Sequence, residues 1–154
     1  MKWQDVGDMP CSVARSMAIL GDRWTMLILR NAFMAMRRFD DFQASLGMPR
    51  HILSTRLKKL VEAGVFVKVP YQEAPVRYEY RLTEKGKDMY PIIMALVAWG
   101  DKWLDEGKGA PLVFHHKRCG KAFTPVVCCS ECGEPVVARE VMATAGPGLQ
   151  AEAG

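Results

Sequence analysis

The sequence contains no apolar run long enough to cross a membrane. Its longest apolar stretch, residues 24–36, is interrupted by Arg30 and Asn31, whereas a membrane-spanning helix needs about 20 consecutive apolar residues. The first residues also lack the apolar core and small-residue cleavage site of a secretory signal. We therefore expect a cytoplasmic protein without membrane contact, a compartment in which disulfides are rare.

Common enzyme motifs are also missing from the 154 residues. The sequence has no glycine-rich phosphate loop, no His-Glu-x-x-His zinc motif and no serine nucleophile elbow. A catalytic Cys119 with His115 or His116 as its base has weak support, because proximity in sequence does not establish the required geometry. These absences argue against an enzyme and favour a binding protein.

Positive charge is concentrated in one part of the chain. The segment from Arg50 to Lys87 holds nine basic and four acidic residues, a net charge of +5, whereas the whole chain carries +4. All other residues therefore sum to −1. A local positive field of this kind is typical of a surface that binds a polyanion such as nucleic acid.

Helix signals follow one another through the first 64 residues. Pro10 and Pro49 suit the first turn of a helix. Asp22 and Asp40 suit the N-cap position, where a side-chain oxygen accepts hydrogen bonds from free backbone N–H groups. We predict helices over residues 10–20, 24–34, 40–46 and 50–63. The second of these is apolar almost all round, which is typical of a helix at the centre of a domain.

The predicted helix over residues 50–63 has two different faces. A helix turns by about 100° per residue, which gathers four apolar side chains on one face: Leu53, Leu57, Leu60 and Val61. On the side opposite this apolar face lie His51, Thr55 and Lys58, and beside the edge of the apolar face lie Arg50 and Ser54. A short helix, a glycine turn and an amphipathic helix with a basic outer face are the order of a helix-turn-helix.

After Gly64 the apolar period changes from 3.6 residues to 2. Residues 65–69 and 77–82 alternate as β-strands do, and the proline-bounded residues 70–75 between them predict a loop. The pair is therefore expected to form a hairpin with an extended tip, a wing. Together these elements predict an α+β fold, a winged helix-turn-helix domain that is mainly helical with a β-hairpin wing.

A further helix is expected from Glu84, capped by Thr83, with Pro91 kinking or interrupting it. Beyond Pro91 one apolar stripe is predicted: Ile93, Leu96, Val97, Gly100, Trp103 and Leu104. Ile92 and Trp99 fall outside this stripe, so the helix needs a second cover. We expect this helix and the first helix to pair with those of a second copy in a two-fold homodimer. The alternative cover is the C-terminal segment of the same chain.

Five segments between Cys11 and Trp103 carry a family resemblance in combination. They are Cys-Ser-Val-Ala-Arg at 11–15, Gly-Asp-Arg-Trp-Thr-Met-Leu-Ile-Leu-Arg at 21–30, Arg-Phe-Asp-Asp-Phe at 38–42, Leu-Ser-Thr-Arg-Leu-Lys-Lys-Leu-Val-Glu-Ala-Gly at 53–64, and Arg-Tyr-Glu-Tyr-Arg-Leu-Thr-Glu-Lys-Gly at 77–86. Taken together, the segments resemble the HxlR-type family of winged helix-turn-helix transcriptional regulators.

The resemblance implies a cytoplasmic, dimeric regulator of nearby genes that binds double-stranded operator DNA. Members of this family often respond to a reactive or aromatic small molecule, so the resemblance also implies a small-molecule effector. By the same resemblance, the helix that opens at Pro49 enters the major groove, and the wing around Arg77 touches the DNA backbone or the minor groove. Pro49 departs from the family, because many relatives carry a small polar residue there.

The expected DNA contacts come from the outer face of that helix and from the wing. The helix residues are Arg50, His51, Ser54, Thr55 and Lys58, and the wing residues are Lys68 and Arg77. Arginine suits guanine, short hydroxyl groups suit bases or phosphates, and lysine suits phosphates. The alternatives are an ordinary solvated helix face and a surface ion pair of Arg77 with Glu79 or Glu73. For the domain as a whole, the alternative is a winged-helix protein-interaction module that does not bind DNA.

Cys11 is a redox-sensing candidate. It follows Pro10 at a helix start, where backbone amides and the nearby Arg15 favour a thiolate that reacts with oxidants or electrophiles. The family resemblance sharpens this expectation, because several members sense through a cysteine near this position. The alternative is a small, inert side chain that packs in the core.

The other four cysteines lie in the last quarter of the chain. His116 and Cys119, and then Cys129 and Cys132, form two pairs with the same spacing, and a glycine follows each pair. This pattern predicts the two turns of a structural zinc site with four protein ligands. His115 and Cys128 are neighbours of the ligands and leave the register open. The alternative is a pair of turns that has lost its metal or closes by a disulfide on oxidation.

These patterns divide the chain into three expected parts. Residues 1–107 form the winged helix-turn-helix domain for DNA binding and dimerisation, and residues 108–142 form a cysteine-rich, ribbon-like segment. Residues 143–154 have no periodicity and are expected to be a flexible tail.

Overall fold

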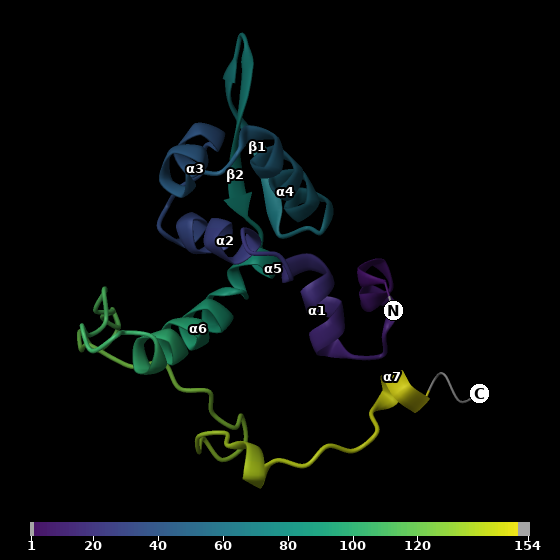
Figure 1. Cartoon of the computed structure of the whole chain (residues 1–154), viewed down its shortest axis with the longest axis vertical. Helices are drawn as coiled ribbons and strands as arrows, with labels where there is room; N and C mark the ends of the chain where they lie inside the picture. Colours follow the sequence, from purple (N-terminus) through teal and green to yellow (C-terminus); the bar gives the residue numbers. More distant parts are fainter. Residues whose placement is uncertain (1, 151–154) are drawn as a thin grey trace. The chain divides into compact units, whose positions relative to one another are not determined.

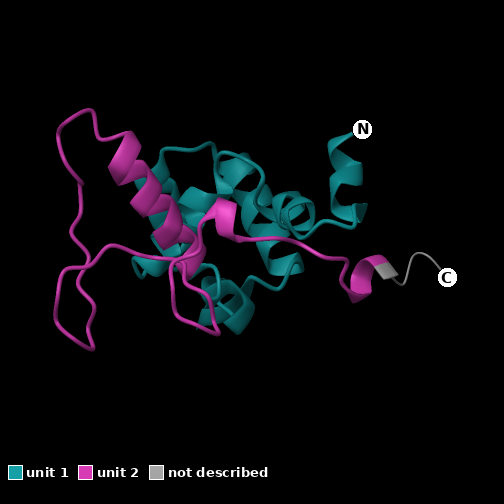
Figure 2. Cartoon of the chain, turned by 90° about the horizontal axis from the view of Figure 1, so that it is seen from below, with its two compact units in different colours: residues 1–90 teal, residues 91–154 magenta. Residues whose placement is uncertain are grey.

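The computed structural model describes residues 2–150 of the chain (Figure 1). The chain divides into two compact units, residues 1–90 and residues 91–154, which Figure 2 shows in separate colours. Among the described residues, no helix has both the length and the apolar character that crossing a membrane requires.

The first unit begins with a 3-10 helix, η1 (Trp3–Asp8), that packs on helix α1 (Ser12–Leu20). The Trp3 ring and the Met17 carbonyl lie against Gly21 so closely that a side chain at Gly21 has no space. The small residue at the end of α1 therefore allows the N-terminal segment to fold back on this helix.

Helices α2 (Thr25–Phe33), α3 (Phe39–Leu46) and α4 (Arg50–Glu62) form the centre of the first unit. The predicted cap at Asp22 is confirmed, because Asp22 Oδ1 accepts hydrogen bonds from the Trp24 and Thr25 backbone N–H groups at 2.9 and 3.0 Å. Gly47 ends α3 in the left-handed region, with φ of 62°, where glycine is favoured. This turn sets α4 against α3 in the order that the sequence predicts.

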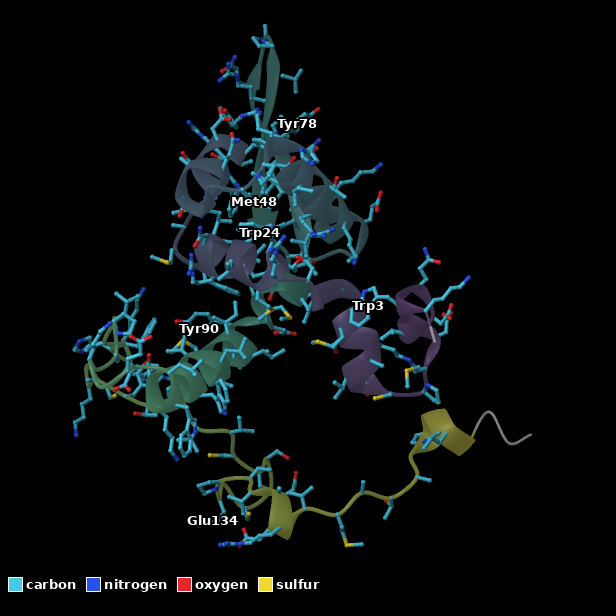
Figure 3. All side chains as sticks on the ribbon, viewed as in Figure 1. Trp3, Trp24, Met48, Tyr78, Tyr90 and Glu134 are labelled. Atoms are coloured by element: carbon cyan, nitrogen blue, oxygen red, sulfur yellow. The ribbon has the colours of Figure 1, made fainter. Side chains whose placement is uncertain are left out.

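Apolar side chains from these three helices and from the following strand form the core. The buried apolar residues here are Ile28, Leu29, Phe42, Met48, Leu53, Leu57, Leu60, Val65 and Phe66. Figure 3 labels Met48, which lies among the helices. Burying one such side chain contributes about 1.5–3 kcal/mol to folding, so the core fixes which face of each helix is exposed.

Strands β1 (Phe66–Glu73) and β2 (Val76–Leu82) pair antiparallel and form the wing, whose tip projects beyond α3 and α4 in Figure 1. The strands are longer than the sequence predicts. Most of the expected 70–75 loop is paired strand, with Pro70 opposite Tyr78. Proline is tolerated there because this hairpin has only two strands and β1 needs no donor on its outer side.

The loop before α3 extends the pairing on the other side of the wing. The Tyr80 backbone N–H donates to the Arg37 carbonyl at 2.7 Å, and Arg38 forms an isolated bridge with Glu79. The helix-turn-helix and the wing are therefore joined by backbone hydrogen bonds as well as by the core.

A single-turn helix, α5 (Glu84–Lys87), follows the wing, and α6 (Tyr90–Trp103) begins immediately afterwards. Thr83 caps α5 as predicted, because its Oγ1 accepts a hydrogen bond from the Gly86 N–H at 3.1 Å. Pro91 lies in the first turn of α6, where its missing N–H costs no helical bond. The predicted interruption at Pro91 is therefore confirmed.

The exposed face of α6 differs from the prediction. Leu96 and Trp103 were expected beside Ile93, but they are 52% and 65% exposed. They share one face with Ile92 and Trp99, because residues spaced by three or four positions lie on the same side of a helix. The buried side of α6 is formed by Ile93 and Met94 instead.

The rest of the second unit has little regular structure. Two isolated bridges, His115 with Ala122 and Cys128 with Pro135, mark two tight loops, and two short helices follow, η2 (Ala138–Glu140) and α7 (Pro147–Gln150). No residue from 104 to 149 is buried. Of the expected tail, residues 143–150 include α7, and residues 151–154 lie outside the described residues.

Candidate nucleic-acid interface

The outer face of α4 is polar and accessible. His51, Ser54, Thr55 and Lys58 are all exposed, whereas the leucines on the opposite side of the helix are buried. The Thr55 hydroxyl donates to the His51 carbonyl at 2.9 Å, which leaves its oxygen able to accept a further hydrogen bond. Lys58 lies 3.9 Å from Glu62, and both side chains are mostly exposed, so this pair is weak.

Arg50 is attached to the neighbouring helix. Its Nη1 donates to Asp40 Oδ1 at 3.0 Å and to Gln43 Oε1 at 2.7 Å. The guanidinium also lies 4.6 Å from the centre of the Phe39 ring. Arg50 therefore links α3 to α4, and its Nε and Nη2 groups make no hydrogen bond to any described residue. Sequence reasoning assigned Arg50 to DNA alone and did not foresee this link.

The wing presents two of the expected cations. Lys68 Nζ lies 4.4 Å from the centre of the Tyr78 ring, which Figure 3 shows on the hairpin. Arg77 is exposed and makes no ion pair within the part of the chain that the structure describes. Glu79 pairs with Arg81 at 2.9 Å instead, and the hydrogen bond from Arg81 holds the pKa of Glu79 below its ordinary value.

Sequence reasoning missed Arg38 and Tyr71. The Arg38 guanidinium lies 4.1 Å from the centre of the Tyr71 ring on β1, and its Nε is 3.7 Å from Glu79 Oε1. Arg38 therefore adds a cation at the side of the wing. The signal was the Arg37-Arg38 pair just before α3, which lies outside the basic segment that begins at Arg50.

An ion pair holds α4 to the start of α2. Arg56 Nε lies 3.1 Å from Asp22 Oδ1, and both side chains are largely covered. Burial raises the pKa of Asp22. Hydrogen bonds from Thr25 and Trp24, together with the Arg56 charge, lower it by more, so the pKa of Asp22 is below its ordinary value. Asp22 is therefore charged at neutral pH and fixes the position of α4.

Cys11 occupies the N-cap position of α1 and is exposed. Its side chain makes no capping hydrogen bond. The Arg15 Nε donates to the Met9 carbonyl at 3.0 Å. The structure therefore places the Cys11 thiol at the surface, where small molecules reach it.

The four expected zinc ligands lie in two separate turns. Cys119 Sγ is 3.6 Å from His116 Nδ1 in the first turn, and Cys129 and Cys132 belong to the second. Among residues 2–150, no three His, Cys, Asp or Glu side chains are grouped closely enough to hold a metal ion. The structure thus shows the winged helix-turn-helix but does not show the predicted zinc ribbon.

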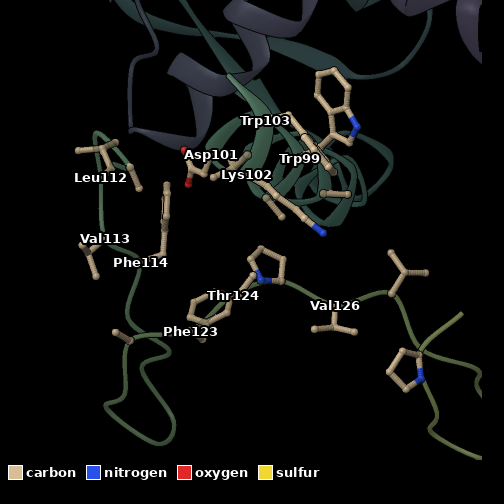
Figure 4. Close-up of a pocket in the computed structure, with 18 of the residues that line it drawn as sticks. Trp99, Asp101, Lys102, Trp103, Leu112, Val113, Phe114, Phe123, Thr124 and Val126 are labelled. Carbon is tan, nitrogen blue, oxygen red and sulfur yellow. The ribbon is translucent and has the colours of Figure 1, made fainter. Parts of the chain in front are cut away.

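A cavity of about 1010 Å³ lies within the second unit. Figure 4 shows Trp99 and Trp103 of α6 on one side and Phe114 and Phe123 on the other. Most of the wall is apolar or aromatic, and its charged groups are Asp101 and Lys102. A cavity with these walls suits an apolar or aromatic molecule.

Comparisons with known proteins agree with this geometry. Residues 19–108 match the family model described as HxlR-like helix-turn-helix. The uncharacterized HTH-type transcriptional regulator Rv3095 of Mycobacterium tuberculosis is 46% identical over 141 residues, which are 92% of this chain and 89% of the relative.

Two solved structures are similar. PA1607 has a TM-score of 0.82 and 34% identity, with 91% of this chain and 98% of PA1607 covered. The transcriptional regulator YodB of Bacillus subtilis, in its reduced form, has a TM-score of 0.53 and 29% identity, with 64% of this chain and 99% of YodB covered. The family match agrees with the helix-turn-helix, and the solved structures agree with the fold that carries it. The chain belongs to the HxlR-like helix-turn-helix family of transcriptional regulators, which are not enzymes.

Proposed function

We propose that this protein is a cytoplasmic, sequence-specific regulator that binds operator DNA as a homodimer. In this proposal α4 enters the major groove and the wing contacts the adjacent backbone. The observation that carries the proposal is the exposed polar face of α4, held in place by three buried leucines and by the Asp22–Arg56 ion pair. A helix fixed in this way meets DNA without a cost of ordering its backbone, so only the exposed side chains lose freedom.

The residues on this surface divide into two roles. Arg50, His51, Ser54 and Thr55 contact base edges, because their donors and acceptors lie at the start of α4, the end that enters the groove in helix-turn-helix proteins. Lys58 contacts phosphate, and so do the wing cations, Lys68 and Arg77. Arg38 joins them at the side of the wing.

The homodimer is proposed from the exposed apolar face of α6. Ile92, Leu96, Trp99 and Trp103 are 48–65% exposed and follow one another at helical spacing. Large apolar side chains gathered on one face are typical of an interface between proteins. A two-fold pair presents two α4 helices to the two halves of a palindromic operator.

We also propose that regulation involves a small molecule or a redox signal. The aromatic cavity of the second unit, which shares Trp99 and Trp103 with the proposed dimer face, supports an aromatic effector that binds beside the dimer interface. The exposed Cys11 thiol supports reaction with electrophiles, and the likeness to YodB, which was solved in a reduced form, agrees with a redox role. With a quinone, the Cys11 sulfur adds to a ring carbon, the thiol proton passes to one ring oxygen and the hydrogen of the attacked carbon passes to the other, which yields a hydroquinone thioether.

Selection of bound sequences from random duplex DNA tests the DNA-binding proposal. The expected product is a palindrome whose half-sites lie about one helical turn, about 34–36 Å, or a multiple of it apart. Binding to the selected duplex is expected to weaken steeply with salt, because several phosphates are neutralised. Enrichment of no sequence, together with no salt-dependent duplex binding, would overturn the proposal and favour the protein-interaction module.

A further inference from the structure

Two loops of the second unit have the same backbone pattern, displaced by 13 residues. In the first loop the Phe123 N–H donates to the Phe114 carbonyl at 3.0 Å. In the second loop the Val136 N–H donates to the Val127 carbonyl at 2.9 Å. Each bond closes a short hairpin. The chain therefore contains a structural repeat that spans residues 114–123 and 127–136.

The turns at the ends of these hairpins also match. Gly120 N–H donates to the His116 carbonyl at 2.7 Å, and Gly133 N–H donates to the Cys129 carbonyl at 2.9 Å. Both glycines have a left-handed φ, 73° and 77°, which other residues rarely adopt. Each turn thus begins at the first residue of one predicted ligand pair and ends at the glycine after it.

This repeat favours one register of the ligands. His116 and Cys129 occupy equivalent positions, each at the start of a turn, and Cys119 and Cys132 occupy the next equivalent pair. The Glu131 N–H points to Cys129 Sγ at 3.4 Å, a contact that stabilises a thiolate. Cys128 instead precedes the turn, in an isolated bridge with Pro135.

His115 is the equivalent of Cys128 in the first hairpin, where it forms an isolated bridge with Ala122. Successive residues of an extended strand point to opposite sides. His115 and Cys128 therefore point away from the sides on which His116 and Cys129 begin their turns. This alternation favours His116 and Cys129 over their neighbours as ligands.

We propose that the two turns are the halves of one tetrahedral zinc site, with His116, Cys119, Cys129 and Cys132 as ligands. Four nitrogen and sulfur ligands leave no open position on zinc, so the site is structural rather than catalytic. Only residues 124–126 lie between the two hairpins, so closure around the ion turns one hairpin against the other and needs no break in either turn.

Opposite charges on the two turns favour this closure. The first hairpin carries Lys117, Arg118 and Lys121, whereas the second carries Glu131 and Glu134. Charges of opposite sign attract as the hairpins approach. Three thiolates and one zinc ion also leave a net negative charge, which the cations of the first turn offset.

Closure also supplies the core that this segment lacks. Val113, Val126 and Val127 are 61–67% exposed, and Val136 is 46% exposed. Segments below about 40 residues usually need a metal, disulfides or a partner to fold. Zinc binding would supply this folding free energy and would bring the valines of the two hairpins together.

Metal analysis of the full chain tests the proposal. Protein purified in reductant, without chelator or nickel resin, and then incubated with zinc alone is expected to retain about one zinc ion per chain after gel filtration. The Cys129→Ser/Cys132→Ser double variant is expected to retain almost none. The matched controls Cys128→Ser and Cys11→Ser are expected to bind as the wild type does. No zinc in the wild type, or equal loss in Cys128→Ser, would overturn the proposal.

Cobalt gives a readout of the ligands themselves. Tetrahedral cobalt with thiolate ligands is expected to give strong visible absorption, and zinc is expected to remove it. His116→Ala is expected to weaken this spectrum, whereas His115→Ala is expected to preserve it. Unchanged helical circular dichroism shows that the winged helix-turn-helix of each variant is folded. A variant that passes this check and keeps the wild-type spectrum after loss of a proposed ligand contradicts the assignment.

A mixing experiment separates a site within one chain from a site shared by two. His116→Ala/Cys119→Ser chains are mixed with Cys129→Ser/Cys132→Ser chains after denaturation and refolding together. The mixture is expected to bind no more zinc than either variant alone, because each chain lacks half of its own site. Recovery of zinc binding in the mixture would overturn closure within the chain.

Discussion

Arg56 on α4 lies 3.1 Å from Asp22, the residue that caps α2. One carboxylate thus accepts hydrogen bonds from backbone N–H groups at the start of α2 and also pairs with α4, the helix that carries the proposed DNA contacts. The positions of α2 and α4 depend on the same charge, so the stability of the domain and the geometry of its surface are linked.

Replacement of Asp22 is expected to destabilise the first unit. Asp22→Asn weakens the cap and removes the charge opposite Arg56, and we expect a loss of about 1–2 kcal/mol in the free energy of unfolding. Chemical denaturation at neutral pH measures it. Asp41→Asn, which changes an exposed carboxylate in the first turn of α3, is the matched control and is expected to have a much smaller effect. Equal effects of the two changes would contradict this assignment.

The same carboxylate predicts a dependence on pH. The pKa of Asp22 is lowered in the folded protein from an ordinary value of 3.8. The contribution of Asp22 to the free energy of unfolding is therefore fully present above pH 3.8, and it is lost as the pH falls through the lower pKa of the folded protein. The difference in stability between wild type and Asp22→Asn is expected to be constant near neutral pH and to shrink in acid below that value. A stability difference that grows on acidification would contradict this assignment of the Asp22 charge.

Two changes on α4 are expected to affect DNA binding differently. Thr55→Ala is expected to reduce the preference for the operator over other duplexes, because a contact to a base edge is lost. Lys58→Ala is expected to weaken binding to all duplexes and to reduce the salt slope by about 1. Lys108→Ala removes a similarly exposed and ion-paired lysine outside the first unit and serves as the control. Gel-shift titration at several salt concentrations distinguishes the effects.

Arg50→Ala is expected to lower operator preference at little cost in stability. Its ion pair with Asp40 is exposed, and such pairs contribute about 0–1 kcal/mol. Asp40→Asn removes the same ion pair but keeps the guanidinium, so it is expected to preserve operator preference. Gel shifts with operator and scrambled duplexes measure the preference. Equal loss in both variants would mean that Arg50 acts only through its link to α3.

The wing is expected to contribute affinity without specificity. Arg77→Ala should weaken binding to operator and to unrelated duplexes by a similar factor, because a phosphate contact carries no sequence information. The control Arg139→Ala removes an exposed arginine on η2. Wild-type affinity of Arg77→Ala at moderate salt would remove the wing from the interface.

The exposed face of α6 predicts the effect of a charge at Trp99. Trp99→Glu is expected to turn the dimer into a monomer, because an unpaired charge at an apolar interface is costly to bury. Analytical ultracentrifugation at micromolar concentration measures the state. Met34→Glu, on an equally exposed apolar residue at the end of α2, should leave the dimer intact. A wild-type protein that sediments as a monomer would refute the dimer itself.

The sequence by itself determined the order of elements and the faces of α4. Glycines and prolines marked the ends of the helices, and the change of apolar period from 3.6 to 2 located the wing, because these signals act over a few neighbouring residues. The helical spacing of apolar residues also predicted core positions for Phe42, Leu53, Leu57 and Leu60, and all four are buried. The ligand spacing in the C-terminal turns is local information too, and the backbone repeat agrees with it.

The tertiary structure decided what depends on contacts between distant residues. Arg50 meets Asp40, Arg38 meets Tyr71 and Arg56 meets Asp22 only after the helices and the wing are packed. The strands of the wing continue past Pro70 because cross-strand pairing outweighs the local signal for a loop. Leu96 and Trp103 are exposed because only one side of a helix is covered by its neighbours, and the apolar period does not tell which side that is.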